Sequence, residues 1–372
     1  VIGLTHASKA DERIVVNAKI NGKPIRFVFD TGAENTALFS STAKRLNLSV
    51  TYPPKGTKAE PGRVLTGISE KCQTEMIGQS ATGRLRVLDV PSYFAKNIDG
   101  VVSWNALRPR NGLLRIDSNN NTATGLTALP HDIDQWSKWN LNTNANILAF
   151  SLTNTPLGNG AIFIDTGTPR GLELCPKLWK KWQRDQSDQA STLNATYTPA
   201  SGLLVSSEYW TDQWNIGGFS IDNVPVTQAV PEAKHAFKNH LATLGLFALT
   251  RFNIIIDKKN NTIYIKKNLN PKAVYQQNRV GAVFVPINMQ NKDLVAHVVK
   301  GSPGYNAGIR DKDILLSIGN LDVTKWRTDP RVLPLSRFWE QPAGTKLKLS
   351  LRRNEERFEA TVILKEILRK KT

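Results

Sequence analysis

The sequence predicts an all-β, bilobal protein followed by a small α+β domain near its C-terminal end. Two observations point to the lobes: β-prone apolar runs recur between Gly, Asn and Pro turns, and one such run, ending in Asp-Thr-Gly, occurs twice. A third points to the added domain, because the pattern of apolar runs changes after Pro271. With 372 residues, the chain has room for two or three domains.

The repeated run is Phe-Val-Phe-Asp-Thr-Gly-Ala at 27–33 and Ile-Phe-Ile-Asp-Thr-Gly-Thr at 162–168. A single Asp-Thr-Gly would indicate no more than a strand that ends in a turn. Other segments repeat in the same order: 89–91 with 223–225, 104–107 with 246–249, and 117–122 with 257–262. We therefore interpret the chain as an internal duplication, with an N-terminal lobe at 1–139 and a C-terminal lobe at 140–268.

An Asp at the end of a buried strand is costly unless its charge is used or satisfied. Two such carboxylates side by side cannot both ionise easily, so they share one proton. The ionised partner can take a proton from a water, while the protonated partner donates to the carbonyl oxygen of a peptide bond. The repeated Asp thus predicts general acid–base hydrolysis without a covalent intermediate. Because the pair titrates as a unit, neither role is assigned to a particular Asp.

These motifs resemble the aspartic peptidases in their two-lobed, single-chain form. Each lobe is more similar to the retroviral and bacterial single-lobe members than to pepsin, and the resemblance covers about residues 10–268. It implies a catalytic dyad of Asp30 and Asp165 at the interface between the lobes. It also implies supporting residues in the two active loops, where the threonines brace the loops and the glycines let the backbone approach the substrate: Thr31, Gly32 and Ala33 in the first, Thr166, Gly167 and Thr168 in the second.

The two copies differ after the glycine, where the first has Ala33 and the second Thr168. A hydroxyl there can hydrogen-bond a carboxylate and favour its charged form, so we expect Asp165 to be the more acidic partner. The family's second signature is two apolar residues and a Gly beneath each active loop. It matches Thr-Leu-Gly at 243–245 and, with Ser in place of Gly, Val-Val-Ser at 101–103.

A glycine-rich, β-prone stretch at 63–86 occupies the place where the family has its flap, a hairpin that closes over the substrate. We place the tip of this flap near Gly67, Ile68 and Ser69. An ordinary surface hairpin would fit the same stretch about as well. The stretch holds no tyrosine, so a flap of the pepsin type is not expected.

Other elements are predicted from turns and periodicity. Asn21-Gly22 predicts a hairpin of two strands, and 40–48 predicts a short helix capped by Ser40 or Ser41. Residues 176–183 predict an amphipathic helix that begins at a Pro and whose two tryptophans belong to the core. The second lobe is completed by predicted strands at 203–216, which would be the counterpart of the flap, and at 252–256 and 262–265.

A polar break at 269–278 predicts a linker. The following run resembles the bacterial PDZ domains attached to serine proteases, with Gly-Ser-Pro at 301–303, Ala-Gly-Ile at 307–309 and Asp-Ile-Leu at 313–315. This resemblance covers about 279–368, and we assign the domain to 279–372.

The PDZ resemblance implies a loop whose backbone amides hold the C-terminal carboxylate of a peptide ligand, which then adds as a strand. A helix at about 334–340 would border the groove, and an insertion with Trp326 and Pro330 would obstruct or extend it. At one of the loop positions Val283 stands where a glycine is usual. The residues that would form this peptide-binding site are Val280, Gly281, Ala282, Val283 and Phe284.

The formal net charge is +18, and 19 Lys and Arg against 10 acidic residues place about half of it in 270–372. The basicity is therefore spread along the chain, and no nucleic-acid-binding motif is present. This positive charge is compatible with attraction to an anionic surface or to acidic partners. The alternative is a basic surface that is only solvated. The sequence contains no run of 18 apolar residues, so no membrane span is predicted.

No metal or cofactor is expected, because the five His are scattered without metal-ligand spacing and no phosphate-binding Gly loop occurs. Cys72 and Cys175 fall in different lobes, so an inter-lobe disulfide and two buried free thiols are both open. The first residue is Val rather than Met, which together with the type of PDZ domain leads us to expect a periplasmic or secreted protein.

The sequence thus predicts a monomeric aspartic endopeptidase that hydrolyses peptides or proteins between its lobes, with a PDZ domain for docking or regulation. A competing hypothesis is a non-catalytic scaffold that binds peptides with the same fold, although both Asp-Thr-Gly motifs are intact. A third hypothesis is an intermolecular dimer of lobes, which two Asp in one chain make unnecessary.

Overall fold

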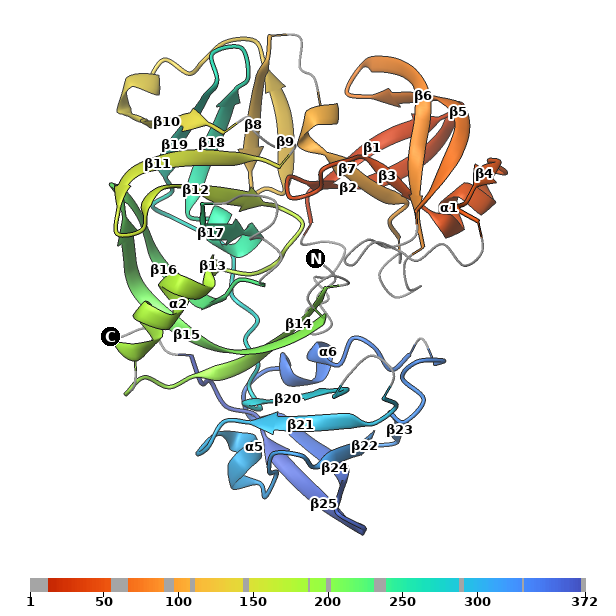
Figure 1. Ribbon diagram of the computed structural model, residues 1–372, viewed down its shortest axis with the longest axis vertical. Coiled ribbons are helices and arrows are strands. Elements are labelled where there is room, and N and C mark those ends of the chain that lie inside the picture. Colours follow the sequence, from red (N-terminus) through yellow and green to blue (C-terminus); the bar gives the residue numbers. More distant parts are fainter. Residues whose placement is uncertain are drawn as a thin grey trace.

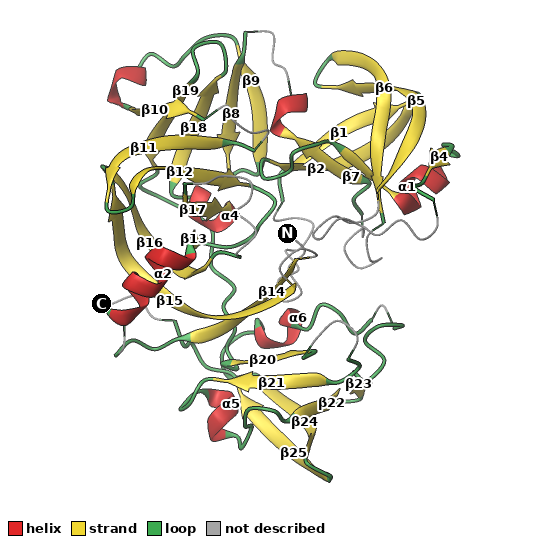
Figure 2. Ribbon diagram, viewed as in Figure 1, coloured by secondary structure: helices red, strands yellow, loops and turns green. Residues whose placement is uncertain are grey.

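The computed structural model describes residues 13–54, 66–89, 97–107, 111–142, 147–186, 188–198, 202–230, 239–287, 291–329 and 331–368. It is mostly β, with 50% of the residues in strands and 11% in helices, which confirms the predicted dominance of strands. The described residues form three sheets, and Figures 1 and 2 show their arrangement.

The first sheet has seven strands in the order β1-β2-β7-β3-β6-β5-β4, and β1 also pairs with β5. Asn21 and Gly22 connect β1 to β2 with positive φ angles of 48° and 76°, so the predicted hairpin is confirmed. Its elements are β1 (Val15–Ile20), β2 (Lys23–Asp30), β3 (Ala37–Phe39), α1 (Ser40–Arg45), β4 (Val50–Thr51), β5 (Thr66–Met76), β6 (Gln79–Leu88) and β7 (Gly100–Ser103).

Helix α1 lies where it was predicted, but its capping was predicted wrongly. Phe39 is the N-cap, and no side chain caps the helix. The hydroxyl of Ser40 instead donates to the Asp89 carboxylate at 2.8 Å.

The second sheet has twelve strands in the order β14-β15-β16-β13-β17-β12-β11-β10-β19-β18-β8-β9. Helix α2 begins at a Pro, as predicted, and buries Trp179. The strands are β8 (Leu113–Asp117), β9 (Thr122–Leu126), β10 (Ser137–Leu141), β11 (Ala149–Thr155), β12 (Gly158–Asp165), β13 (Leu172–Leu174), β14 (Thr192–Thr198), β15 (Gly202–Ile216), β16 (Phe219–Gln228), β17 (His240–Gly245), β18 (Phe252–Asp257) and β19 (Thr262–Lys267). The helices are η2 (Trp104–Ala106), η3 (Ile133–Gln135), α2 (Pro176–Arg184) and α4 (Leu246–Leu249).

The internal repeat is visible in two matching hairpins, β8–β9 and β18–β19. Each turns through an Asp whose carboxylate accepts the backbone N–H of an Asn three residues later: Asp117 from Asn120 at 3.2 Å, and Asp257 from Asn260 at 3.0 Å. Strands β8 and β18 pair antiparallel and join the hairpins edge to edge (Figure 1). Strands β8 and β9 and the start of β10, which lie within the range 1–139 predicted for the first lobe, therefore pair in the larger sheet.

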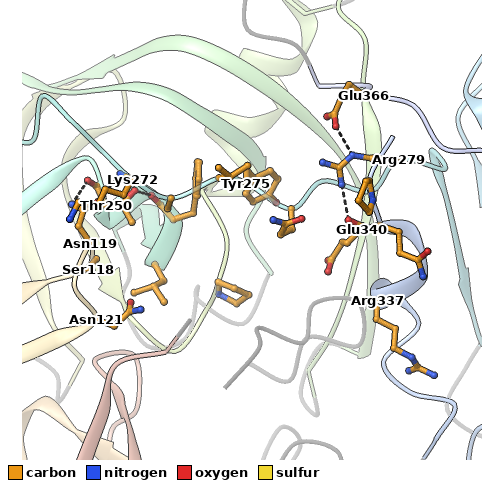
Figure 3. Close-up of a pocket in the computed structure, with 18 of the residues that line it drawn as sticks. Ser118, Asn119, Asn121, Thr250, Lys272, Tyr275, Arg279, Arg337, Glu340 and Glu366 are labelled. Atoms are coloured by element: carbon orange, nitrogen blue, oxygen red, sulfur yellow. Dashed lines mark hydrogen bonds and ion pairs between the residues drawn. The ribbon is translucent and has the colours of Figure 1, made fainter. Parts of the chain in front are cut away.

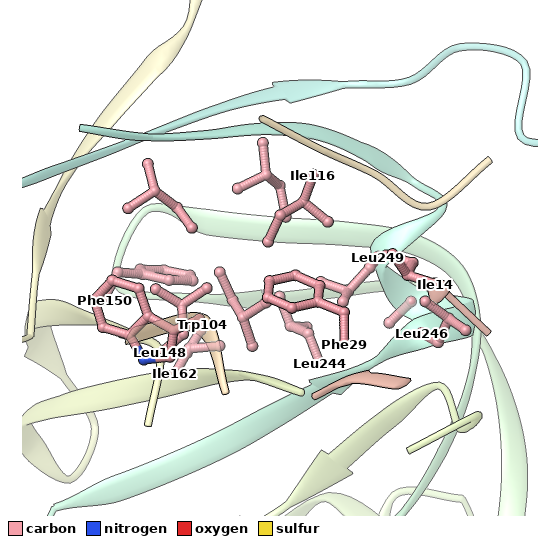
Figure 4. Packing of buried hydrophobic residues seen from close by; sticks show 14 of the residues in the cluster. Ile14, Phe29, Trp104, Ile116, Leu148, Phe150, Ile162, Leu244, Leu246 and Leu249 are labelled. Atoms are coloured by element: carbon pink, nitrogen blue, oxygen red, sulfur yellow. The ribbon is translucent and has the colours of Figure 1, made fainter. Parts of the chain in front are cut away.

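Side chains from both copies of the repeat share one hydrophobic core. Phe29 and Trp104 from the first half pack in the same cluster as Phe150 and Leu244 from the second, and Ile116 of β8 lies among them (Figure 4). Because this core crosses the boundary between the halves, their mutual orientation is fixed by packing rather than by a hinge.

The C-terminal domain has its own sheet, ordered β20-β21-β22-β24-β25 with β23 on β22, and its own core. The hydroxyl of Ser302 accepts from the Tyr305 N–H at 3.2 Å and so caps α5 within the predicted Gly-Ser-Pro turn. The elements are β20 (Ala282–Val285), β21 (Leu294–Val298), α5 (Pro303–Asn306), β22 (Ile314–Ile318), β23 (Leu321–Asp322), α6 (Ser336–Trp339), β24 (Lys346–Arg353) and β25 (Glu356–Ile363).

Candidate active site

The two Asp-Thr-Gly motifs end the central strands of the two copies of the repeat. β2 runs parallel to β7, and Asp30 pairs with Ser103; β12 runs parallel to β17, and Asp165 pairs with Gly245. The second signature of each copy thus lies directly beside the Asp that it was predicted to support.

The two active loops hold each other through their threonines. The Thr31 hydroxyl donates to the carbonyl of Ile164 at 2.6 Å, and the Thr166 hydroxyl donates to the carbonyl of Phe29 at 2.7 Å. In return the Thr31 N–H donates to the Thr166 hydroxyl at 3.1 Å, and the Thr166 N–H donates to the Thr31 hydroxyl at 3.0 Å. Both threonines are fully buried, so these reciprocal bonds satisfy groups that water does not reach.

Each carboxyl group lies against the glycine of the opposite loop. A methyl group at Gly32 would come within 2.6 Å of the Asp165 carboxyl carbon, and one at Gly167 would meet the Asp30 carboxyl group even more closely. Asp30 also accepts the Gly32 N–H at 2.9 Å, and Asp165 accepts the Gly167 N–H at 2.8 Å. The structure therefore brings together the two aspartates that the sequence predicted as a pair.

Burial, together with smaller effects of the neighbouring Asp30 and of the Glu173 carboxylate, raises the pKa of Asp165 to about 7. Because the two carboxyl groups titrate as a pair, the relative acidity of Asp30 and Asp165 stays a prediction. Thr168 is buried, and its backbone carbonyl accepts the Leu246 N–H at 2.7 Å.

The Ser and the Gly of the second signature differ because their surroundings differ. At Gly245 a side chain would meet the carbonyl group of Arg170, so only Gly fits. Ser103 is buried without such an obstacle, and its N–H donates to the Thr36 hydroxyl at 3.2 Å.

The predicted flap tip was misplaced. Gly67, Ile68 and Ser69 lie inside β5, which pairs with both β4 and β6. Gly67 is needed because the side chains of Val50 and Tyr52 pack where its Cβ would be, not because the chain turns there. Ser69 is buried and accepts the Leu85 N–H at 2.9 Å, whereas Ile68 is 49% exposed. The chain between β4 and β5 runs through 55–65, which lie outside the described residues.

Sequence reasoning missed a buried polar group directly behind the Asp165 loop. Arg170 is 2% exposed, and its guanidinium pairs with Glu173 at 2.6 Å. It also donates to Asn194 at 3.2 Å and to Thr196, both on β14. Two opposite charges within an otherwise apolar stretch next to the second motif were the available signal.

The predicted peptide-binding loop of the C-terminal domain is closed. Val280, Ala282, Val283 and Phe284 are each at most 3% exposed. The N–H groups of Val280 and Gly281, which would hold a carboxylate, donate to the Asn278 side-chain oxygen at 3.0 and 3.2 Å. The expectation of an open site at these residues is therefore wrong for this structure.

The groove expected between β20 and α6 is also filled. Trp339 packs on Phe284 with ring centroids 5.7 Å apart, and Trp326 donates to the Lys292 carbonyl at 2.7 Å. The space left among these side chains is about 10 Å³, room for no more than one water. Trp326 thus obstructs the groove, and Pro330 lies outside the described residues.

A cavity of about 860 Å³ lies between the C-terminal domain and the two halves of the repeat, with the β8–β9 turn of the first half at one end (Figure 3). Pro169 and Phe247 line it near the Asp165 loop, and Arg279 lines the other end. Arg279 is held there by Glu366 at 2.6 Å and by the Glu340 carbonyl at 2.8 Å.

Three further findings concern the described part of the chain. It contains no cluster of three or more side chains suited to a metal ion, and none of its helices is long and apolar enough to span a membrane. Cys72 and Cys175 are both buried free thiols, which decides between the two alternatives for the cysteines.

Comparison with known families agrees with the first half of the site. Residues 16–115 match the family model described as aspartyl protease. This stretch contains Asp30 and Ser103 and ends within β8, whereas Asp165 lies outside it and is related to Asp30 through the internal repeat.

A solved structure similar to part of the chain is the EIAV protease complexed with the inhibitor HBY-793. It is 21% identical, covers 27% of this chain and 91% of its own, and has a TM-score of 0.21. No curated protein matches.

Proposed function

We propose that the protein is an aspartic endopeptidase whose dyad is Asp30 and Asp165. The observation that carries the proposal is the pair of active loops, joined by reciprocal threonine bonds, with each carboxyl group packed on the opposite glycine. Such an arrangement holds two carboxyl groups at one point on an interface, and both are half-buried, so a substrate and a water can reach them.

In the proposed mechanism the pair keeps one proton up to about pH 7, since the pKa of Asp165 is raised to about 7. The ionised carboxylate takes a proton from a water as that water attacks the peptide carbonyl carbon. The protonated carboxyl group donates to the carbonyl oxygen, and a proton then passes to the leaving nitrogen. The Gly32 and Gly167 N–H groups, which donate to the carboxylates, keep both groups oriented.

For the C-terminal domain, the Ser302-capped turn and the strand order around it are consistent with the PDZ resemblance. We propose that the domain has this fold but acts through contacts within the chain. A peptide ligand at Val280 and Gly281 would first have to displace the Asn278 side chain.

The function is tested by cleavage of a diverse peptide library between pH 3 and 8, with and without pepstatin. Wild type is compared with Asp30→Asn and Asp165→Asn, and with Asp222→Asn as a matched control, since Asp222 is a half-exposed carboxylate of β16 that pairs with Lys267. We expect each dyad variant to lower kcat at least about 100-fold and the control to leave it within twofold.

Cleavage that survives in either dyad variant would contradict a shared dyad. If wild type binds peptides but cleaves none at any pH, the chain is a binding scaffold and the proposal fails.

A further inference from the structure

We propose that Arg170 is a positioning residue for the Asp165 loop, residues 165–168, and that the C-terminal domain keeps it in place by clamping the hairpin β14–β15. The inference rests on the proposed function for its kinetic readout, but its structural readout is independent of catalysis. It is carried by a continuous set of buried contacts from the active loop to the C-terminal domain.

The first contacts fix the chain just after the Asp165 loop. The Thr168 carbonyl accepts the Leu246 N–H at 2.7 Å, and the Arg170 carbonyl accepts the Phe247 N–H at 3.1 Å. Gly245 packs directly on the Arg170 carbonyl group, which leaves no space for that backbone to move toward β17. The backbone from Thr168 to Arg170 is thus pressed against the start of α4.

The Arg170 side chain extends the same segment to the hairpin. Its guanidinium is bonded to Glu173 of β13 and to Asn194 and Thr196 of β14, and all four side chains are less than 9% exposed. A buried guanidinium that loses its partners is left as an uncompensated buried charge, which is strongly destabilising. Displacement of β14 would therefore also displace Arg170 or leave it unpaired.

The opposite face of β14 packs on the C-terminal domain. Side chains alternate along a strand, so Asn194 and Thr196 face Arg170 while Leu193 and Ala195 face the other way. Ala195 is fully buried in a cluster with Val283 and Val285 of β20 (Figure 1 shows the two elements side by side). β14 is therefore enclosed between the Arg170 side chain on one side and β20 on the other.

Asn278 fastens this packing with polar bonds in both directions. Its side-chain N–H groups donate to the Leu193 carbonyl at 3.0 Å and to the Ala282 carbonyl at 2.9 Å. Its backbone carbonyl accepts the Thr192 hydroxyl at 2.7 Å. The same side chain occupies the Val280 and Gly281 N–H groups. Asn278 thus joins the predicted peptide-binding loop of the C-terminal domain, at Val280 and Gly281, to β14.

The connection before Asn278 adds a second anchor. The Tyr275 hydroxyl donates to the Glu208 carboxylate of β15 at 2.6 Å, and Glu208 pairs with Thr192 across the hairpin. Burial and the Glu208 charge raise the pKa of Tyr275, so the phenol remains a donor. The predicted linker is therefore part of the clamp.

The test compares Arg170→Lys, Asn278→Asp and the double variant with wild type. Lys keeps the charge but loses the two-pronged geometry, and Asp keeps an acceptor for the Val280 and Gly281 amides but removes the donor to Leu193. Arg251→Lys is the matched control, because Arg251 is also buried at 8% exposure but bonds Asn223 and Thr250, neither in the hairpin. Hydrogen exchange by mass spectrometry and cleavage of a library-derived peptide are measured on the full chain.

We expect faster exchange at 164–174 and 192–208 in both single variants, with the twin loop at 27–33 unchanged as an internal control. kcat should fall about 10- to 100-fold in Arg170→Lys and less in Asn278→Asp, with KM within about threefold. Because both residues act through one hairpin, the double variant should lose no more than Arg170→Lys alone.

The proposal is overturned if Asn278→Asp changes neither exchange nor kcat, or if the losses in the double variant multiply. Faster exchange in an enzyme that cleaves nothing would support the clamp and reject the proposed function. Unchanged exchange in variants of an enzyme that cleaves peptides would support the proposed function and reject the clamp. If Arg170→Lys loses its fold as a whole, exchange at 27–33 will also become faster. The clamp is then tested by the exchange and kcat of Asn278→Asp alone.

Discussion

The carboxyl group of Asp165 is difficult to ionise because the surrounding protein desolvates it, a second carboxyl group lies beside it, and the charge of Glu173 is near. The pKa of Asp165 is therefore raised to about 7, and the pair keeps a shared proton across the acidic range. Single residues thus set the pH at which the candidate site can work, and the surrounding core supplies the largest effect.

We predict that kcat/KM falls as the pH rises through about 7, because the shared proton then leaves the dyad. Glu173→Gln removes a negative charge that raises the pKa of Asp165, so the descending limb should move to lower pH. The measurement is a pH–rate profile of both proteins with one peptide. A limb that stays in place, or moves to higher pH, would contradict the electrostatic role of Glu173.

At the scale of elements, the two copies are similar in pairing but not in packing. Both put the Asp beside a parallel partner strand, yet Gly245 is pressed against Arg170 whereas Ser103 has space for a hydroxyl. The second copy is therefore the more constrained of the two, although the motifs look alike.

Gly245→Ala should be far more harmful than Ser103→Ala. The added methyl meets backbone atoms of Arg170, which cannot rotate away, and we expect a loss of about 1 to 3 kcal/mol in unfolding free energy together with most of the activity. Ser103→Ala should cost less than about 1 kcal/mol. Urea unfolding of the two variants beside wild type measures this, and equal losses would show that the asymmetry is unimportant.

The repeat explains why much of the site could be predicted from the sequence. The repeated Asp-Thr-Gly motif predicts the pairing of Asp30 with Asp165 and the position of their threonines. The hairpin at Asn21-Gly22 is predicted by the turn preference of these two residues. The flap tip could not be placed in this way. Gly67 is a glycine because the side chains of Val50 and Tyr52, which are distant in the sequence, pack where its Cβ would be. Closure of the loop at Val280 and Gly281 by Asn278 likewise depends on tertiary contacts that no local pattern records.

The whole molecule carries a formal net charge of +18, and both the region before residue 270 and the C-terminal domain contribute. Such a charge attracts acidic peptides over distances comparable with the Debye length, about 10 Å at 0.1 M salt. The field acts on encounter with the substrate, not on the chemical step.

We therefore expect kcat/KM for an acidic peptide to fall about tenfold between 0.02 and 0.5 M salt, with kcat nearly unchanged. A neutral peptide with the same residues at the cleaved bond is the control and should change little. Equal salt dependence of the two peptides would argue that the basic surface is merely solvated.

The pairing of β8 with β18 has a consequence for how the chain can be made. β18 reads Phe-Asn-Ile-Ile-Ile-Asp, a strongly β-prone strand, and β8 from the first half covers the edge that β19 leaves open. A nascent or engineered second half without residues 113–117 would present that edge to any neighbouring chain, which is the usual start of aggregation. The first half thus acts as a built-in protector of the second, and the two are best produced as one polypeptide.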